Sequence, residues 1–270
     1  MILVNGIAAD GVAAGDRGLH YGDGVFRTLR LRGGRVLHWP PHLEKLQADC
    51  RALRIACPDN AALHADISAI TRGLSDGVVK VMVTRGSGLR GYAPPAQTVP
   101  TRVVMGSPFS PAPVPPGGIN VHLCALRLGH QPALAGIKHL NRLENVLARA
   151  EWNDASIHEG LLCDQEGNAI GGTMSNLFIV EDGALVTPDL TRCGVAGVTR
   201  QRVMKLARRN GLQCKVENIL LQRVYNAGEW FLVNSVIGLW PAARLEQKVW
   251  TPGTIAAKVK HWLEEDDAAA

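Results

Sequence analysis

Lys138 is the residue whose neighbours in the sequence first suggest chemistry. It follows the apolar residues 135–137, and apolar residues then recur at three- and four-residue steps, which predicts an amphipathic helix over 140–150. Gly136 interrupts whatever precedes it, so Lys138 is predicted at or just before the helix start. A desolvated lysine near the positive end of a helix has a lowered pKa, and its amine can then attack a carbonyl compound. A solvated loop lysine is the alternative, and position alone does not decide between the two.

A second candidate feature is the segment CGVAGVTRQRV, residues 193–203. Gly194 and Gly197 allow a tight turn that delivers Val198 and Thr199 as the first turn of a helix. Unpaired backbone N–H groups and a hydroxyl would then point at an anion, which is how helix starts bind phosphate. An ordinary N-cap threonine is the alternative interpretation.

Three shorter motifs are weaker candidates. YGDGVF, residues 21–26, lacks the strand–loop–helix context of a phosphate cradle and predicts a turn at a strand entry. TRGSGLRGY, residues 84–92, is typical either of a binding loop or of a plain surface loop. VNSV, residues 233–236, places the hydroxyl of Ser235 at a strand end, which alone indicates nothing. The sequence contains no P-loop or H-E-x-x-H motif.

These candidates need a scaffold, and its clearest boundary is PFSPAPVPPGG, residues 108–118. Five prolines and two glycines cannot continue a helix or a central strand, so this stretch predicts a stiff linker. We therefore expect an N-terminal domain over 1–107 and a C-terminal domain over 119–270 that carries Lys138. Predicted strands bunch together more than they alternate with helices, which favours an α+β protein with two α/β-type domains over one doubly wound sheet.

The predicted elements fall on both sides of the linker. In the first half, the strands are MILVNG, VFRTLRLRGGRVL with a Gly-Gly turn, VVKVMVTRG and TRVVMGS, and the helices are PHLEKLQADCRALRI and AALHADISAITRGL. In the second half, the strands are INVHLCAL, the hairpin EGLLCDQEGNAIGG, SNLFIVEDGALVTP with an Asp-Gly turn, CKVENI and EWFLVNSV. The helices there, after the one that follows Lys138, are VTRQRVMKLARRNG with a glycine C-cap signal, LLQRVYNAG and TPGTIAAKVKHWLEED.

Composition bounds the classes of function. The 270 residues are 46% hydrophobic and 20% charged, which is typical of a globular chain, and no apolar run reaches the length of a membrane span. The N-terminus shows no secretory signal, and the six cysteines form no C-x-x-C, so we expect reduced thiols in a cytoplasmic protein and no metal site. The net charge of +5 with only 5% aromatic residues argues against nucleic-acid binding and suits a small anionic substrate.

Together, a lysine in an apolar setting, a phosphate-type helix start and a strand-end hydroxyl are what pyridoxal phosphate needs. The chain resembles the fold-type IV pyridoxal-phosphate enzymes, the class-IV aminotransferase family. The segments that carry the resemblance are DRGLHYGDGVFRT (16–28), HLEKL (42–46), RGSGLRGY (85–92), LRLGHQPALAGIKHLNRLENVL (126–147), MSNLFIV (174–180), GVAGVTRQ (194–201) and VNSVIGLWP (233–241). The segment 126–147 is the specific one, because it is similar to the family's 4-amino-4-deoxychorismate lyase branch more than to its transaminases.

The resemblance implies roles for individual residues. Lys138 would bond covalently to the cofactor and act in catalysis. The N–H groups of Val198 and Thr199, with the hydroxyls of Thr199 and Ser235, would hold the phosphate. The family usually adds an arginine to the phosphate at the position of Lys45, which keeps the charge but lacks the bidentate fork.

Two departures from the family pattern remove negative charge near this site. Gly171 stands where most members have the glutamate that bonds the pyridine nitrogen, and only a register shift would bring Glu166 there. Arg27 replaces a glutamate that is common in the transaminases. An anionic substrate suits both changes, and we expect Arg27 and Arg90 as candidate ligands of its carboxylates.

The implied activity is elimination of pyruvate from 4-amino-4-deoxychorismate, which gives 4-aminobenzoate for folate synthesis. The resemblance also implies a homodimer with the cofactor between the two domains of each chain. A D-amino-acid or branched-chain aminotransferase is the alternative within the family, and the missing glutamate disfavours it. A catalytically silent binding protein that has kept the fold is the alternative from another class.

Overall fold

The computed structural model describes residues 1–88, 90–111 and 113–270, and the chain forms two units. The first unit is Met1–Pro111 together with Ile137–Asn141, and the second is Ala112–Gly136 together with Arg142–Ala270. The change from one unit to the other at residue 111 lies within the expected linker 108–118. The segment that contains Lys138 groups with the first unit, although it lies within the expected C-terminal domain. The domain limits given above remain a prediction.

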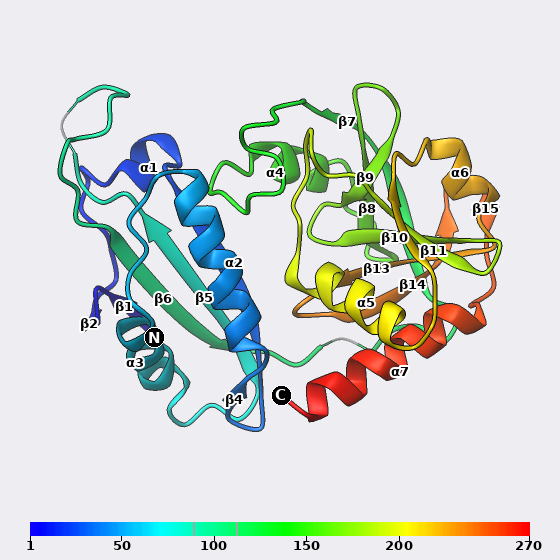
Figure 1. The fold of residues 1–270 in the computed structure, drawn as a ribbon, viewed down its shortest axis with the longest axis horizontal. Helices are drawn as coiled ribbons and strands as arrows, with labels where there is room; N and C mark the ends of the chain where they lie inside the picture. Colours follow the sequence, from blue (N-terminus) through cyan, green and yellow to red (C-terminus); the bar gives the residue numbers. More distant parts are fainter. Residues whose placement is uncertain (89, 112) are drawn as a thin grey trace. The chain divides into compact units, whose positions relative to one another are not determined.

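The first unit is an antiparallel sheet with helices packed against it (Figure 1). Its strand order is β2-β1-β6-β5-β3-β4. Helix α2 packs on β3, and α3 packs on β1, β5 and β6. The elements are β1 (Ile2–Val4), β2 (Ile7–Ala8), α1 (Arg17–Tyr21), β3 (Gly24–Arg32), β4 (Arg35–Val36), α2 (Trp39–Ala52), α3 (Asn60–Thr71), β5 (Gly77–Thr84) and β6 (Thr101–Pro108).

Strand β3 places one charged side chain, that of Arg27, on the buried face of the sheet. Successive strand residues point to opposite faces, and the residues of one face, Val25, Arg27, Leu29 and Leu31, are all buried. Val25 and Leu29 join the core with Leu46 of α2. Arg27 therefore occupies a core-facing position, where a charge requires a partner.

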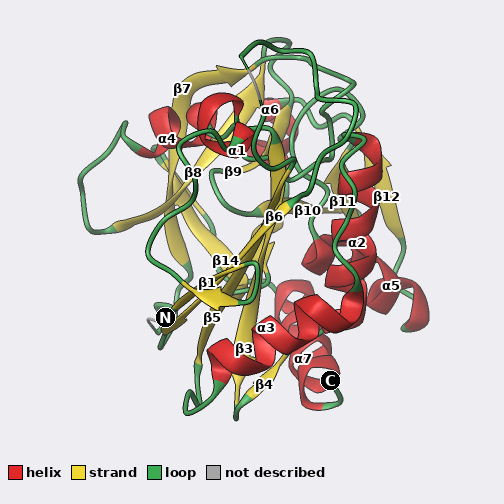
Figure 2. Cartoon of the chain, turned by 90° about the vertical axis from the view of Figure 1, so that its left-hand side faces the viewer, coloured by secondary structure: helices red, strands yellow, loops and turns green. Residues whose placement is uncertain are grey.

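The second unit is a nine-stranded sheet of order β12-β11-β10-β13-β14-β7-β8-β9, with β15 beside β14. A further pairing of β9 with β10, at Gly171 and Asn176, closes part of this path into a ring. Helices α5 and α7 lie side by side and pack on β13, as Figure 2 also shows in red. The elements are β7 (Ile119–Leu128), α4 (Leu143–Arg149), β8 (Ile157–Asp164), β9 (Ala169–Gly172), β10 (Asn176–Glu181), β11 (Ala184–Pro188), α5 (Val198–Arg209), β12 (Cys214–Glu217), α6 (Leu221–Asn226), β13 (Glu229–Asn234), β14 (Gly238–Leu245), β15 (Lys248–Val249) and α7 (Thr254–Ala268).

Most predicted elements are confirmed, including the Gly-Gly turn and the Asp-Gly turn. Gly33 and Gly34 both have positive φ between β3 and β4, and so do Asp182 and Gly183 between β10 and β11. Two central residues with positive φ define the type I′ turn that such sequences favour. The structure adds β14, which no sequence pattern above indicated.

The helix predicted over 140–150 is confirmed in part, but Lys138 lies further from its start than expected. Helix α4 begins five residues later, at Leu143, and the side predicted to be buried is in part exposed, since Leu143 is 75% and Leu147 60% accessible. The reason is that the main chain around Lys138 pairs with β3. Phe26 N donates to Lys138 O at 2.9 Å, and Leu140 N donates to Gly24 O at 2.9 Å. These groups are therefore not available for a helical turn.

Among the described residues, no helix is both long and apolar enough to cross a membrane.

The core beneath α2 predicts a measurable stability difference. Leu46 is fully buried on α2, so Leu46→Ala should lower the free energy of unfolding by about 2–5 kcal/mol through lost burial and a cavity. Leu19→Ala is the matched control, because Leu19 of the same unit is 65% exposed and should change stability by less than about 0.5 kcal/mol. Urea unfolding of both variants checks this, and equal losses would contradict the core assignment.

Candidate active site

Lys138 lies in the first unit, on a short extended segment held against the start of β3. Its side chain is half-buried, and its Nζ lies 4.6 Å from the centre of the Phe26 ring. Lys80 Nζ lies 4.9 Å from the centre of the same ring. An aromatic face attracts a cation through its quadrupole and leaves the amine partly desolvated. The apolar setting expected for Lys138 is thus provided largely by Phe26, which the sequence analysis did not single out.

Asp49 is the carboxylate around which this part of the first unit is organised. Its Oδ2 accepts a hydrogen bond from the Lys138 main-chain N at 3.2 Å and pairs with Arg27 Nη2. Its Oδ1 accepts from Lys45 Nζ, one helical turn earlier on α2. The side chains of Arg27 and Asp49 are each 2% exposed, and that of Lys45 is 14% exposed. One buried carboxylate therefore joins the predicted covalent lysine to both predicted cations.

Burial disfavours the charged forms of the two cations. It lowers the pKa of Arg27 to about 10, and burial together with the Arg27 charge lowers the pKa of Lys45 to about 8. Arg27 Nε has no hydrogen-bond acceptor among the described residues. Arg27 and Lys45 therefore share the Asp49 carboxylate, which makes their burial tolerable.

The helix start predicted after Gly197 is confirmed in the second unit. Helix α5 begins at Val198 after Gly197, whose position provides no side-chain cap. Asn176 braces the turn before it: Gly197 N donates to Asn176 Oδ1 at 3.2 Å, and Asn176 Nδ2 donates to Val195 O at 2.7 Å. A Cβ on residue 197 would overlap Asn176 Oδ1, so glycine is required there. First-turn N–H groups without a side-chain cap can serve an anion.

Two hydroxyls meet at this helix start. Thr199 Oγ1 and Ser235 Oγ lie 3.0 Å apart, within hydrogen-bonding distance. Asn234 shapes the turn that presents Ser235, because its Oδ1 accepts from Val236 N at 2.8 Å and Ile237 N at 2.9 Å. The structure thus brings Val198, Thr199 and Ser235 together, as the resemblance implied, and adds Asn176 and Asn234 as the residues that hold them.

Gly171, where the family usually has a glutamate, lies where β9 meets β10. Its φ is not in the left-handed region, but a Cβ there would lie 2.8 Å from the Ser175 carbonyl oxygen. A larger side chain would require the following loop to move. Glu166 does not replace the missing carboxylate, because both of its oxygens bond the exposed Arg192, at 2.6 and 2.7 Å.

A buried carboxylate that the sequence analysis did not consider, Glu159, fixes that following loop. Its oxygens accept hydrogen bonds from Thr173 Oγ1 at 2.5 Å, Ser175 Oγ at 2.8 Å and the main-chain N of residues 173 and 174 at 3.1 and 3.3 Å. The number of donors on one carboxylate indicates that Glu159 holds the loop beside Gly171.

Arg90, predicted to bind substrate, is exposed in the loop after β5. Arg17 fastens this loop, since its Nη1 and Nη2 donate to the carbonyl oxygens of Gly91 and Tyr92 at 3.0 and 2.9 Å. Leu89 lies outside the described residues. Arg90 therefore belongs to an anchored surface loop, and its predicted role is compatible with that position.

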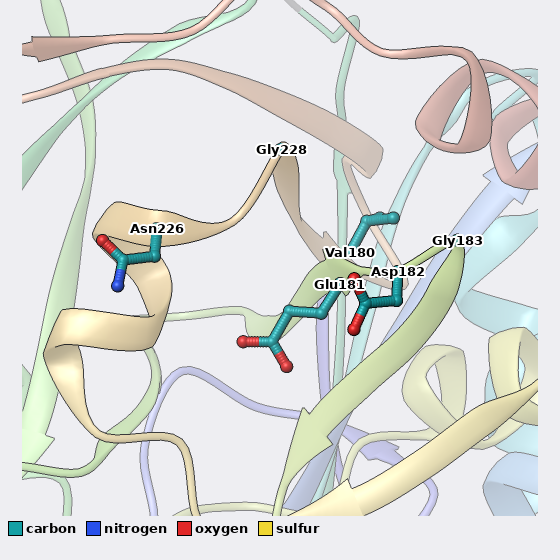
Figure 3. Close-up of a pocket in the computed structure, with 6 residues that line it drawn as sticks. All are labelled: Val180, Glu181, Asp182, Gly183, Asn226 and Gly228. Carbon is teal, nitrogen blue, oxygen red and sulfur yellow. The ribbon is translucent and has the colours of Figure 1, made fainter.

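Two other features of the second unit contain none of the predicted site residues. A surface pocket of about 560 Å³ lies between the β10–β11 turn and the end of α6 (Figure 3), and Val180, Glu181, Asp182, Gly183, Asn226 and Gly228 line it. His130, Asp164 and Cys193 bring potential metal-ligand atoms within 4.8 Å of one another. Asp164 already accepts hydrogen bonds from Asn168 and from the main chain of Glu166, as expected of a turn cap.

The predicted site residues lie in both units. The first provides an amine beside an aromatic ring and two buried cations, and the second provides a helix start with free N–H groups and two hydroxyls. These are the donor types that a phosphate-bearing carbonyl cofactor requires. Lys45 could be recognised from the family pattern. Asp49 carried only the signal of its i,i+4 spacing from Lys45, which is common on solvated helix faces.

Comparison with known proteins shows the family of this chain and its relatives. A family model described as amino-transferase class IV matches residues 24–245. Aminodeoxychorismate lyase of Vibrio harveyi is 36% identical over 247 residues, 90% of this chain and 90% of that protein. D-alanine aminotransferase of Bacillus licheniformis is 25% identical over 260 residues, 92% of this chain and 89% of that protein. The crystal structure of 4-amino-4-deoxychorismate lyase from Pseudomonas aeruginosa is 45% identical, with a TM-score of 0.93, and the match covers 98% of this chain and 99% of that one.

The Asp49 cluster makes a stability prediction. Asp49→Ala should lower the free energy of unfolding by about 3–5 kcal/mol, because it leaves two buried basic groups without their carboxylate. Glu166→Ala is the control, since it removes an exposed ion pair and should cost less than about 1 kcal/mol. Chemical denaturation at constant pH and salt measures both. A loss for Asp49→Ala as small as that of the control would show that Asp49 does not hold the cations.

Proposed function

Since the chain belongs to the class-IV aminotransferase family, whose fold type matches the one expected from the sequence, we propose that it is a pyridoxal-phosphate-dependent 4-amino-4-deoxychorismate lyase. The observation that carries the choice is the 45% identity to the Pseudomonas aeruginosa lyase over nearly the whole of both chains. The reaction would convert 4-amino-4-deoxychorismate to 4-aminobenzoate and pyruvate, and so supply folate synthesis.

The cofactor of this family is pyridoxal 5′-phosphate. We assign its phosphate to the N–H groups of Val198 and Thr199 and the hydroxyls of Thr199 and Ser235, with Lys45 as an additional cation. What supports this assignment is the uncapped start of α5 and the 3.0 Å contact between the two hydroxyls. Lys138 would bond covalently to the aldehyde carbon, supported by its setting on the Phe26 ring.

When bound, the cofactor withdraws electrons from the substrate carbon that carries the amine. In our proposal Lys138, displaced by the substrate amine, takes the proton from that carbon as general base and then returns a proton as the enolpyruvyl group departs. The Asp49 hydrogen bond to its main chain keeps Lys138 in place during both transfers. The substrate ring becomes aromatic as pyruvate leaves, and this aromatisation drives the reaction. The reaction therefore depends less on a carboxylate at the pyridine nitrogen, and Gly171 is acceptable at that position.

The substrate carries two carboxylates, and we propose Arg90 as one of their ligands. Arg27, the other predicted ligand, is buried and paired with Asp49. This burial argues against direct contact with the substrate and favours a role in holding Asp49.

An aminotransferase is the second candidate, supported by the 25% identity to a D-alanine aminotransferase. Gly171 argues against it, because transamination depends more strongly on negative charge stabilised through the ring. Incubation with 4-amino-4-deoxychorismate, followed by 4-aminobenzoate release, separates these activities. Release of 4-aminobenzoate supports the lyase, whereas amino-group transfer to a keto acid without it would overturn the proposal.

We further propose a cytoplasmic homodimer. The six cysteines are all unpaired, as is usual for a reducing compartment. The face of α4 formed by Leu143, Val146 and Leu147 is exposed and apolar, which suits a partner chain.

Lys138→Ala should abolish 4-aminobenzoate release and the visible absorbance of the cofactor–lysine bond, while the unfolding midpoint stays close to that of the wild type. The side chain is only half-buried, so its loss should leave the fold intact. Lys80→Ala, which removes the other ammonium near Phe26, is the matched control and should keep both signals. Full turnover by Lys138→Ala would remove Lys138 from the mechanism.

Light scattering of the purified chain should give the mass of a dimer at micromolar concentration. Leu147→Glu on the exposed face of α4 should shift the mass toward the monomer, because it would bury a charge in the contact. Leu19→Glu, an equally exposed leucine on α1, serves as the control. A fully active monomer of the wild type would contradict the dimer.

A further inference from the structure

Two cysteines of the first unit lie beside each other at the end of α2, next to Asp49. Cys50 belongs to the last turn of the helix and is fully buried, whereas Cys57 lies in the segment that follows and is partly exposed. The side chains of Cys50 and Cys57 form a hydrogen bond with each other. Both thiols are free, and the proposed reaction uses neither. The first unit therefore contains a pair of thiols whose role is open.

The turn after α2 brings the chain back toward Cys50. Arg54 has a φ of 54°, in the left-handed region, and Ile55 N donates to Cys50 O at 2.8 Å. Arg85 fixes the same turn, because its guanidinium donates to two of the turn's carbonyl oxygens at 2.7 and 2.9 Å. Cys57 then packs against the core cluster that contains Cys50. Main-chain contacts and core packing thus hold the two thiols together.

The two thiols differ in acidity and in access to solvent. The hydrogen bond from Cys50, together with the charge of Arg51, lowers the pKa of Cys57. The same hydrogen bond, together with burial, raises the pKa of Cys50. A thiolate is the attacking species in exchange with a disulfide, and it must be reachable by the reagent. Cys57 is therefore the thiol that reacts first, and Cys50 lies where it can react second.

We propose that Cys50 and Cys57 are a site of reversible oxidation, at which a low-molecular-weight disulfide such as glutathione disulfide converts the two thiols to one intramolecular disulfide. The Cys57 thiolate attacks one sulfur of the reagent, and the first glutathione leaves as a thiolate that takes a proton from water. The Cys50 sulfur then attacks the Cys57 sulfur, and the proton of Cys50 passes to the second departing glutathione. Two protein thiols are oxidised, and one glutathione disulfide is reduced to two thiols.

The disulfide acts on the proposed reaction through Asp49, the residue before Cys50. Two sulfur atoms approach each other more closely in a disulfide than in a hydrogen bond, so its formation draws the end of α2 and residues 55–57 together. Asp49 accepts a hydrogen bond from the main-chain N of Lys138 and pairs with Arg27. A shift of the last turn of α2 therefore disturbs the contact that positions Lys138. This effect on turnover rests on the proposed function, whereas the disulfide itself does not.

The test follows the thiols by mass, so its result does not depend on turnover. Reduced full-length protein is incubated with glutathione disulfide, the remaining thiols are alkylated, and the peptides are analysed by mass spectrometry. We expect a disulfide between Cys50 and Cys57, without retained glutathione, that dithiothreitol reverses. Cys57 should react about tenfold faster than Cys214, a partly exposed thiol of the second unit whose pKa is raised by burial.

Substitutions separate the two steps of the exchange. Cys50→Ser should stop at the mixed disulfide between glutathione and Cys57, whereas Cys57→Ser should leave Cys50 reduced. Cys50→Ala provides the same measurement if a hydroxyl at the buried position prevents folding. Cys214→Ser is the matched control, and it should form the disulfide between Cys50 and Cys57 at the wild-type rate.

Turnover of the same samples measures the coupling to Asp49. Oxidised wild-type protein should release 4-aminobenzoate about tenfold more slowly than reduced protein, because Lys138 is misplaced, and dithiothreitol should restore the rate. Cys57→Ser should keep its rate after the same treatment. Cys214→Ser should lose and regain activity as the wild type does.

Each outcome decides a defined part of the inference. Wild-type protein that retains glutathione on Cys57 while Cys50 stays reduced would overturn it, and so would a Cys57 that reacts no faster than Cys214. A disulfide that forms without any change in turnover would overturn the coupling through Asp49. Failure of the reduced wild type to release 4-aminobenzoate would instead refute the proposed function, and the mass analysis would still decide whether the disulfide forms.

Discussion

The hydrogen bonds and ion pairs of one buried carboxylate, Asp49, connect the parts of the first unit that matter for chemistry. A helix, α2, carries Asp49 and Lys45, a strand, β3, carries Arg27, and a segment far along the chain carries Lys138. A buried carboxylate is tolerated only where cations and N–H donors satisfy it. The same contacts that make Asp49 tolerable therefore fix the position of the lysine on which the proposed reaction depends.

Glycines and short polar braces perform the corresponding task in the second unit. Gly197 leaves room for Asn176, which holds the turn before α5, and Asn234 holds the turn that presents Ser235. The presence of glycine at position 171 has a different physical reason. It lies where β9 meets β10 and faces the Ser175 carbonyl, in a loop held by Glu159. A glutamate at this position would therefore require the loop to move.

The sequence predicted the elements that local patterns control. The Asp182–Gly183 turn, strand β3 and the start of α5 after Gly197 all follow from preferences of a few adjacent residues. The sequence did not predict features that depend on contacts between residues far apart in the chain. Helix α4 begins five residues after Lys138, because β3 takes the main-chain hydrogen bonds of residues 138 and 140. No sequence pattern indicated the contacts of Asp49 with Arg27 and Lys138, because both residues are distant from Asp49 along the chain. The roles of Lys138 and Thr199 came from a family resemblance, since spacing alone left each with a plain structural alternative.

The central claim is that Lys138, among the lysines gathered around Phe26 and Asp49, is the one that bonds the cofactor. Borohydride reduction of the cofactor-loaded protein makes that bond permanent, and digestion with mass spectrometry then locates it. The account predicts that the cofactor's mass is found on the peptide that contains Lys138, in nearly every chain, and that Lys45 and Lys80 stay unmodified. A cofactor fixed to Lys45 or Lys80, or a loaded protein with no fixed cofactor, would contradict it.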